Sequence, residues 1–294
     1  MTMLRRLMLG AGLDLDKIAE SNKLYYKAIE KINVNSKVLK NIVLKHSYNA
    51  TTQEGVVICG SPITYFPSLG QNFIKLVIPS SVESWSENCL ASCEIEELII
   101  NSDSMISQNY SESISNYGVV SYNNYWIKNA IINTIVINST NPNLKIGDYV
   151  LAQARVNTVI APSGINIGKG AFKGSRIKEF KVDNFESITF GAESFMQCSI
   201  KSFNMPYGVN PDIPLRLFYD SDYLEYVIFN SNQNIPSLES EAFVHWDSGS
   251  GNFKYSKIIV PDNLYDDWIT TEGWSIIVNH IIKRSDWDAQ QVTE

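Results

Sequence analysis

One short pattern recurs along the chain and constrains its fold more than any other feature. An apolar residue is followed by two variable residues, a second apolar residue, a variable residue, a third apolar residue, and then Pro, Asn or Asp. The pattern occurs eight times between residues 73 and 261, and five of the seven intervals between its central positions measure 21 to 24 residues. The central positions are Leu76, Leu98, Ile135, Val159, Phe180, Phe203, Val227 and Ile258.

A second feature keeps the same phase. A large apolar residue precedes the central position by eight or nine residues. A small residue lies three positions after this large residue. The large residues are Leu90, Leu151, Phe172, Phe195 and Phe218, and the small ones are Cys93, Ala154, Ser175, Cys198 and Ser221. Each repeat therefore predicts a short strand, a turn, and an irregular or short helical return that carries an apolar plug. Because one such unit cannot cover its own apolar face, the repeats are expected to stack into a mainly β solenoid with a parallel sheet.

The units FIKLVIPSSVESWSENCLASC and INIGKGAFKGSRIKEFKV resemble the leucine-rich repeats of the BspA-like surface-protein family. Its recurrent unit combines an LxxIxIP strand with a GxxAFxxC return. The resemblance covers roughly residues 60–262, and this chain departs from it by having Asn or Asp in place of Pro after four of the eight strands. It implies a BspA-like leucine-rich repeat solenoid with end caps.

The flanking segments resemble the caps of the same family. Residues 23–62 are expected to form a β-rich amino-terminal cap, and residues 63–262 the solenoid with insertions at about 101–131 and 245–255. Residues 263–294 are expected to form a carboxy-terminal cap, in which Tyr265, Trp268 and Trp274 cover the open end of the stack. Residues 1–22 are interpreted as an anchoring tail.

Composition excludes several classes of function. The net charge of −7 argues against a nucleic-acid-binding surface. The longest apolar runs fall short of the roughly 18 residues that span a bilayer, so no membrane insertion is expected. Cys93 and Cys198 occupy the small-residue positions of the repeat and Cys59 lies in a strand-like VVICG, so these thiols are expected in the core.

No pattern of catalytic residues is recognisable. His46, His245 and His280 have no partner at metal-ligand spacing. The segment GKGAFKG at 168–174 lacks the Lys-Ser/Thr ending of a phosphate loop, and its Phe172 falls in the repeat register. The acidic segments at 220–222 and 265–268 are interpreted as a turn and a helix start rather than calcium sites. The sequence therefore predicts a protein that is not an enzyme and holds no metal or cofactor.

The two insertions provide the candidate binding residues. The first, at about 101–131, sets aromatic residues among Ser, Asn and Gly, a composition typical of recognition loops; an extra strand pair that packs on the solenoid is the alternative. The second, at 245–255, is either a binding loop or a loose surface loop. The candidate binding residues are Tyr110, Tyr117, Tyr122, Tyr125, Trp126, His245, Trp246 and Asp247.

The outward strand positions form a third candidate surface. They are Val77, Ile99, Val136, Ile160, Lys181, Asn204, Ile228 and Ile259. Six of these residues are apolar, which predicts a sizeable exposed patch unusual for a monomer. The 101–131 insertion is expected to cover this patch, and another subunit is the alternative.

The opening segment suggests a setting for the protein. Residues 1–13 contain Arg5 and Arg6 before an apolar run too short for a secretory signal, so a protein made in a cytoplasm without export is expected. Unexported BspA-like chains with such an opening resemble virion proteins of crAss-like and other tailed phages that infect gut Bacteroidetes.

That resemblance implies a non-enzymatic phage structural protein, such as a tail, fibre or head-decoration component. In such a protein the tail would bind other virion proteins, and the repeats would bind a glycan or protein of the host surface. The protein could also form a homo-oligomer. The alternative is a bacterial cell-surface adhesin of the BspA-like class.

Overall fold

The computed structural model describes residues 19–35, 38–41, 43–110, 113–114, 120–121, 126–127, 129–182, 187–247 and 252–292. The chain divides into two compact units. The first comprises residues 1–106 and 124–139, and the second comprises residues 107–123 and 140–294. Residues 1–18, most of the tail inferred from the sequence, lie outside the described residues.

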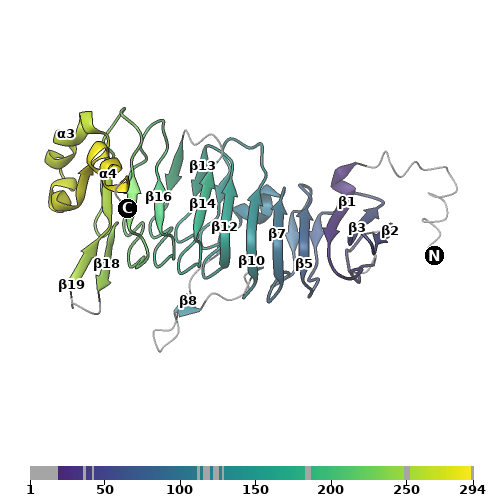
Figure 1. Cartoon of the computed structure of the whole chain (residues 1–294). Coiled ribbons are helices and arrows are strands. Elements are labelled where there is room, and N and C mark those ends of the chain that lie inside the picture. The colour runs from purple at the N-terminus through teal and green to yellow at the C-terminus, as the bar shows by residue number, and fades with distance from the viewer. Residues whose placement is uncertain are drawn as a thin grey trace. The chain divides into compact units, whose positions relative to one another are not determined.

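The first unit combines three parallel strands with an antiparallel segment. Strands β5, β7 and β10 run parallel side by side, whereas β1 pairs antiparallel with both β5 and β3, and β3 pairs antiparallel with β2 (Figure 1). The elements are η2 (Glu20–Asn22), β1 (Lys23–Lys27), β2 (Val43–Asn49), β3 (Glu54–Cys59), β4 (Tyr65–Phe66), β5 (Phe73–Ile78), β6 (Ser84–Trp85), β7 (Glu94–Ile100), α2 (Asp103–Ser107, at the boundary of the unit) and β10 (Ile131–Ile137).

The second unit continues the alternation of strands and turns and ends in short helices. Its strands are β8 (Ser113–Ile114), β9 (Val120–Ser121), β11 (Lys145–Ile146), β12 (Arg155–Ala161), β13 (Ile165–Ile167), β14 (Glu179–Val182), β15 (Ile188–Phe190), β16 (Ser202–Asn204), β17 (Tyr226–Ile228), β18 (Val244–Asp247), β19 (Asn252–Tyr255), β20 (Lys257–Val260) and β21 (Ile281–Lys283). Its helices are η3 (Asp262–Leu264), α3 (Tyr265–Thr270), η4 (Trp274–His280) and α4 (Arg284–Gln291).

The strand pairing confirms the repeat register. In the first unit Leu98 lies opposite both Leu76 and Ile135. In the second unit Val159 lies opposite Phe180, and Val227 lies opposite both Phe203 and Ile258. In these five pairs the central residues of neighbouring repeats face each other. The eight expected strands are all present. The fold is a mainly β solenoid with parallel strands and few helices.

The returns between strands form a second backbone ladder. The amides of Leu151, Phe172 and Phe195 donate to the carbonyls of the residues 20 to 22 positions later, with N···O distances of 2.8, 2.8 and 2.9 Å. The returns are built from turns with left-handed residues four positions apart, as at Glu193 and Gln197, rather than from helices. Because a left-handed conformation costs a residue with a Cβ about 1 kcal/mol or more, the ladder has to compensate for it.

Two glycines permit the close approach of successive returns. A Cβ on Gly168 would lie 2.8 Å from the carbonyl carbon of Gly147, and a Cβ on Gly191 would lie 2.7 Å from that of Gly168. Such distances fall inside van der Waals contact. Gly168 of GKGAFKG thus serves the spacing of the coils, and Phe172 in the same segment is fully buried, as the repeat register predicted.

The apolar plugs stack along the interior of the second unit. Phe172 and Phe195 stack with ring centroids 4.9 Å apart, and Phe195 and Phe218 follow at 5.4 Å. This confirms the predicted stack of plugs. Phe243 extends it at 5.9 Å from Phe218, although the repeat pattern missed Phe243 because the hairpin that follows it lengthens the last interval.

In three of the returns the small residue has a polar role as well as a steric one. The side chains of Ser175, Cys198 and Ser221 donate to the carbonyls of Leu151, Phe172 and Phe195, each of which is the plug of the preceding repeat, at 2.5, 2.8 and 2.8 Å. All three side chains are buried. A hydroxyl or thiol at this position therefore ties one coil to the previous one.

The two insertions adopt paired strands. In the first, β8 and β9 pair antiparallel, as Ser113 opposes Ser121. In the second, β18 and β19 pair antiparallel, as Val244 opposes Tyr255. The alternative of a loose surface loop at 245–255 is therefore wrong for these paired residues, because backbone hydrogen bonds fix them in a hairpin.

The outward strand positions are less exposed than the sequence pattern suggested. Val77, Ile99 and Val136 are half-buried in the first unit, as are Ile160 and Ile228 in the second, whereas Lys181 and Asn204 are exposed. Ile259 is fully buried, and α4 lays Trp287 on this face of β17 and β20. At this end of the second unit the carboxy-terminal segment covers the face, so the expectation of an exposed patch is wrong for Ile259. Residues 111–125 have no described side chains, and cover by the insertion stays a prediction.

Replacement of the central plug tests the register. We expect Phe195→Ala to lower the free energy of unfolding by roughly 3–5 kcal/mol, because it leaves a ring-sized cavity between Phe172 and Phe218. Urea denaturation measures the change. Tyr207→Ala is the control, since Tyr207 is 72% exposed and should change stability by less than about 0.5 kcal/mol. A loss below about 1 kcal/mol for Phe195→Ala would contradict the stacking.

Candidate functional site

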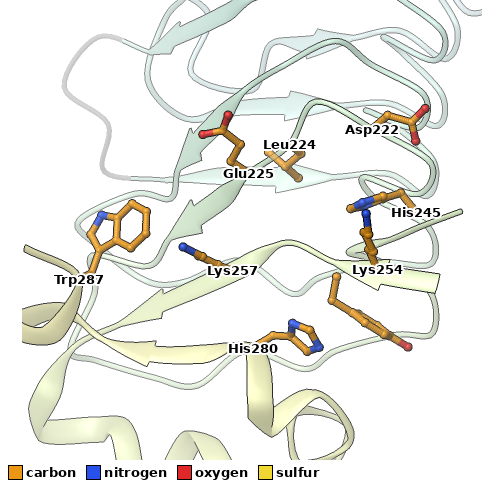
Figure 2. Close-up of a pocket in the computed structure, with 9 residues that line it drawn as sticks. Asp222, Leu224, Glu225, His245, Lys254, Lys257, His280 and Trp287 are labelled. Carbon is orange, nitrogen blue, oxygen red and sulfur yellow. The ribbon is translucent and has the colours of Figure 1, made fainter. Parts of the chain in front are cut away.

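A hollow of about 480 Å³ lies in the second unit, beside the β18–β19 hairpin and the carboxy-terminal segment. Figure 2 shows Glu225, Lys257, His245, Lys254 and His280 around it, contributed by several strands. The complete lining is Asp222, Leu224, Glu225, His245, Lys254, Tyr255, Lys257, His280 and Trp287. The hollow therefore combines cations, carboxylates, imidazoles and aromatic rings.

Parallel pairing brings three of the lining segments together. Tyr226 of β17 lies opposite Lys257 of β20, and Ile258 lies opposite Ile281 of β21. Glu225, Lys257 and His280 consequently stand at the same end of three adjacent strands. The amide of Lys257 donates to the carbonyl of Glu225 at 2.9 Å, which fixes the two backbones at this point.

The hairpin supplies the other wall. His245 of β18 lies opposite Lys254 of β19, next to the Val244–Tyr255 pair at the base of the hairpin. Figure 2 shows the side chains of His245 and Lys254 pointing toward each other above the ring of His280. An insertion that interrupts the repeat thus places two polar residues beside the carboxy-terminal segment.

Trp287 holds Lys257 in place. The ammonium nitrogen of Lys257 lies 5.0 Å from the centroid of the Trp287 ring, a cation–π contact. Trp287 is buried and packs on Tyr226 at 4.7 Å between centroids. The ring is therefore a fixed support, while Lys257 itself stays exposed.

His280 packs beside a tyrosine ring. Its ring centroid lies 5.0 Å from that of Tyr255. Burial lowers the pKa of His280 below its usual value, because a partly desolvated imidazole is less easily charged. The neutral form, with one N–H donor and one acceptor nitrogen, is thus favoured at neutral pH.

The candidate binding residues from the sequence are distributed over different places. His245 lines the hollow, and Trp246 and Asp247 continue β18 beside it, with side chains outside the described part of the chain. Tyr110 is half-buried, and its amide donates to the carbonyl of Asp148 at 2.8 Å. Tyr117, Tyr122 and Tyr125 lie outside the described residues.

Trp126 requires a correction. It is fully buried in the first unit, and its carbonyl accepts a hydrogen bond from the amide of Leu90 at 2.7 Å. A side chain with no exposed surface cannot contact a partner in this conformation. Trp126 is therefore a core residue, although its neighbours in the sequence resemble a recognition loop.

Most of the residues that line the hollow could not be recognised from the sequence as belonging to one site. Lys254, Lys257 and Trp287 carried no signal of their own, and His280 was assigned only to a cap. Recognition of the HIIK segment as one more parallel strand, β21, would have placed His280 beside Lys257. Trp268 and Trp274, expected as cap residues, are fully buried.

The thiols offer no accessible nucleophile. All four cysteines are buried, and burial raises the pKa of Cys59 to about 11 and also raises that of Cys198. A thiol needs its thiolate form to attack or to bind a metal, so these groups are inert at neutral pH. Among the described residues no three His, Cys, Asp or Glu side chains are grouped to hold a metal ion. None of the described helices has the length and apolar character to cross a membrane.

One segment of the chain matches the model of a known repeat family. Residues 144–267 match the BspA type leucine-rich repeat region in six copies. The match lies within the second unit and includes most of the hollow's lining, whereas β5, β7 and β10 lie outside it despite their identical register. A search of curated protein sequences finds no significant match to the chain. The leucine-rich repeat module indicates a role in protein–protein interaction.

The lowered pKa of His280 should make the free energy of unfolding decrease as the pH falls. Because its folded pKa is lowered, the unfolded chain takes up this proton more readily as the pH falls below about 6.5, and the folded state loses stability there. His46, whose pKa burial also lowers, contributes with the same sign. We expect the urea midpoint to fall between pH 7.5 and 5.5 and the His280→Gln variant to show a weaker dependence. Parallel curves for the two proteins would contradict the lowered pKa.

Proposed function

We propose that this chain is a non-enzymatic interaction protein that presents its leucine-rich repeats to a protein partner. The single observation that carries the proposal is the match of residues 144–267 to the BspA type leucine-rich repeat region. Rigid repeats suit recognition because a partner meets a preformed surface and little conformational entropy is lost on binding.

The chemistry of the described residues supports a binding role over catalysis. The buried thiols are protonated, and Lys257 is held against the Trp287 ring. The carboxylate of Glu225 lies 3.4 Å from the ammonium of Lys201. Charged groups fixed by such contacts are suited to recognising a complementary surface.

The proposed setting is a tailed bacteriophage particle, in a tail, fibre or head-decoration component. The support is the resemblance of the opening segment and repeats to virion proteins of crAss-like phages. In this proposal residues 1–22 attach the protein to other virion proteins, and the protein is made in the host cytoplasm. A homo-oligomer is compatible with this role. The second candidate setting is the bacterial cell surface, where the protein would act as a BspA-like adhesin.

Fractionation distinguishes the two settings. Antibodies against the full chain are used on density-gradient-purified phage particles and on washed cells of the bacteria that carry the gene. We expect the protein in the particle fraction in a constant ratio to the major capsid protein. Its presence on intact cells without particles would overturn the phage setting and support the adhesin. Its absence from both surfaces would overturn both settings.

The Tyr-rich insertion is proposed to contact a glycan or protein of the host surface. Tyrosines among small polar residues supply contact area with adaptable hydrogen bonding. The variant Tyr117→Ser/Tyr122→Ser tests this without removing the buried Trp126. We expect fluorescently labelled wild-type protein to bind intact gut Gram-negative cells and the double variant to lose most of that binding.

The control for this measurement is Tyr207→Ser, which removes an exposed tyrosine from the second unit. It should bind cells as the wild type does. Equal binding by the double variant and the wild type would place the contact elsewhere. Equal loss in the control would mean that any exposed tyrosine has this effect.

A further inference from the structure

The hollow beside the hairpin gathers hydrogen-bond donors around two exposed ammonium groups, those of Lys254 and Lys257. Lys257 stands between the segments that carry Glu225 and His280, as the strand register requires. His280 and His245 line the same space with their imidazoles. A ligand in the hollow would therefore meet a cation flanked by imidazoles that can donate hydrogen bonds.

Among the described residues, neither carboxylate of the lining forms an ion pair with Lys257. Glu225 lies 3.4 Å from Lys201, an exposed cation on the neighbouring strand segment. Figure 2 shows Asp222 on the far side of the hollow from Lys257, with its carboxylate pointing away. The contact of Lys257 described by the structure is with the face of Trp287, and an aromatic ring does not replace a carboxylate as an acceptor. The site favours an anion.

The aromatic rings argue against a sugar as the ligand. One face of Tyr255 is occupied by His280 at 5.0 Å, and Trp287 packs between Tyr226 and Lys257. A sugar ring would need a free aromatic face for stacking, and Trp287 is buried. Recognition in this hollow must therefore rest on charge and hydrogen bonds.

We propose that the hollow binds a side-chain carboxylate of an acidic segment in the partner protein, with Lys257 as the ion-pair partner and His280 and His245 as hydrogen-bond donors. This inference rests on the proposed function, since it names the chemistry by which the module recognises its partner. Charge-assisted hydrogen bonds are short and strong, so one carboxylate seated here fixes the register of the bound segment.

Fluorescence anisotropy with the full chain tests the proposal. The probe is a fluorescein-labelled peptide, GSEEEEEEGS, and the matched neutral probe is GSQQQQQQGS. We expect the acidic peptide alone to bind, and Lys257→Gln to weaken its binding about tenfold, the effect of losing one hydrogen bond to a charged group. Binding should weaken further as salt is raised.

The matched control is Lys181→Gln, which removes an exposed lysine from the outward face of β14 in the same unit. It should leave the affinity within about twofold. His280→Gln, which retains a donor, should weaken binding less than Lys257→Gln does. Thermal denaturation of each variant checks that the fold is intact before affinities are compared.

Several outcomes would overturn the inference. Equal binding of the glutamine peptide would mean that no carboxylate is recognised, and equal losses in the two lysine variants would mean that the effect is general charge. Displacement of the acidic peptide by free D-glucuronate at millimolar concentration would point to an acidic sugar in place of a polypeptide. Capture of a partner protein by the Lys257→Gln variant at wild-type strength would overturn the hollow as the contact while leaving the proposed interaction role intact.

Discussion

Each unit depends on one constraint, that its coils lie in register on one another. Strand amides and return amides both bond to the neighbouring coil, and the buried side chains repeat the same alignment: Phe172, Phe195 and Phe218 stack with centroids 4.9 and 5.4 Å apart. The Ser or Cys three residues after a plug donates to the plug of the preceding coil. Because every element of a coil is bonded at the same offset, a shift of one residue in any strand would break the return ladder as well. That mutual dependence explains why left-handed residues such as Glu193 and Gln197 are tolerated in the returns.

The register also explains where function can be added. Between Phe243 and Ile258 the chain makes a hairpin and then resumes the strand ladder, since Ile258 still lies opposite Val227. The extra residues therefore leave the core alignment unchanged and present His245 and Lys254 at its border. The carboxy-terminal segment adds His280 in front of β21 and Trp287 from α4, which lies over Tyr226 and Lys257. The hollow arises where the hairpin and this closing segment meet the last coils, so a regular repeat alone would not have produced it.

The periodic part of the molecule was predictable from the sequence because periodicity is a local property repeated many times. The facing pairs Leu76 and Leu98, and Val227 and Ile258, follow from counting residues, and so does the burial of Cys93 and Cys198. The same reasoning failed for Trp126. Its local composition resembled an exposed loop, whereas its fully buried position depends on contacts with residues such as Leu90 that are distant in the sequence. Phe243 was missed for a related reason, since the inserted hairpin moved it out of phase with the strand that follows.

The sequence by itself determined the solenoid, the positions of its strands and of five plugs, and the burial of Cys93 and Cys198, because each follows from residues recurring at a nearly constant interval. The tertiary structure alone decided which polar residues meet at the hairpin and the carboxy-terminal segment. Lys257 lies in the last repeat, and its register with Val227 already places it beside Glu225. His280 and Trp287 lie outside the repeat, and no interval relates them to Lys257 or His245. Their proximity results from the parallel pairing of β20 with β21, from the fold-back of α4 and from the hairpin. The pKa of His280 was equally beyond the sequence, since it depends on how much water the surrounding chain removes from the imidazole.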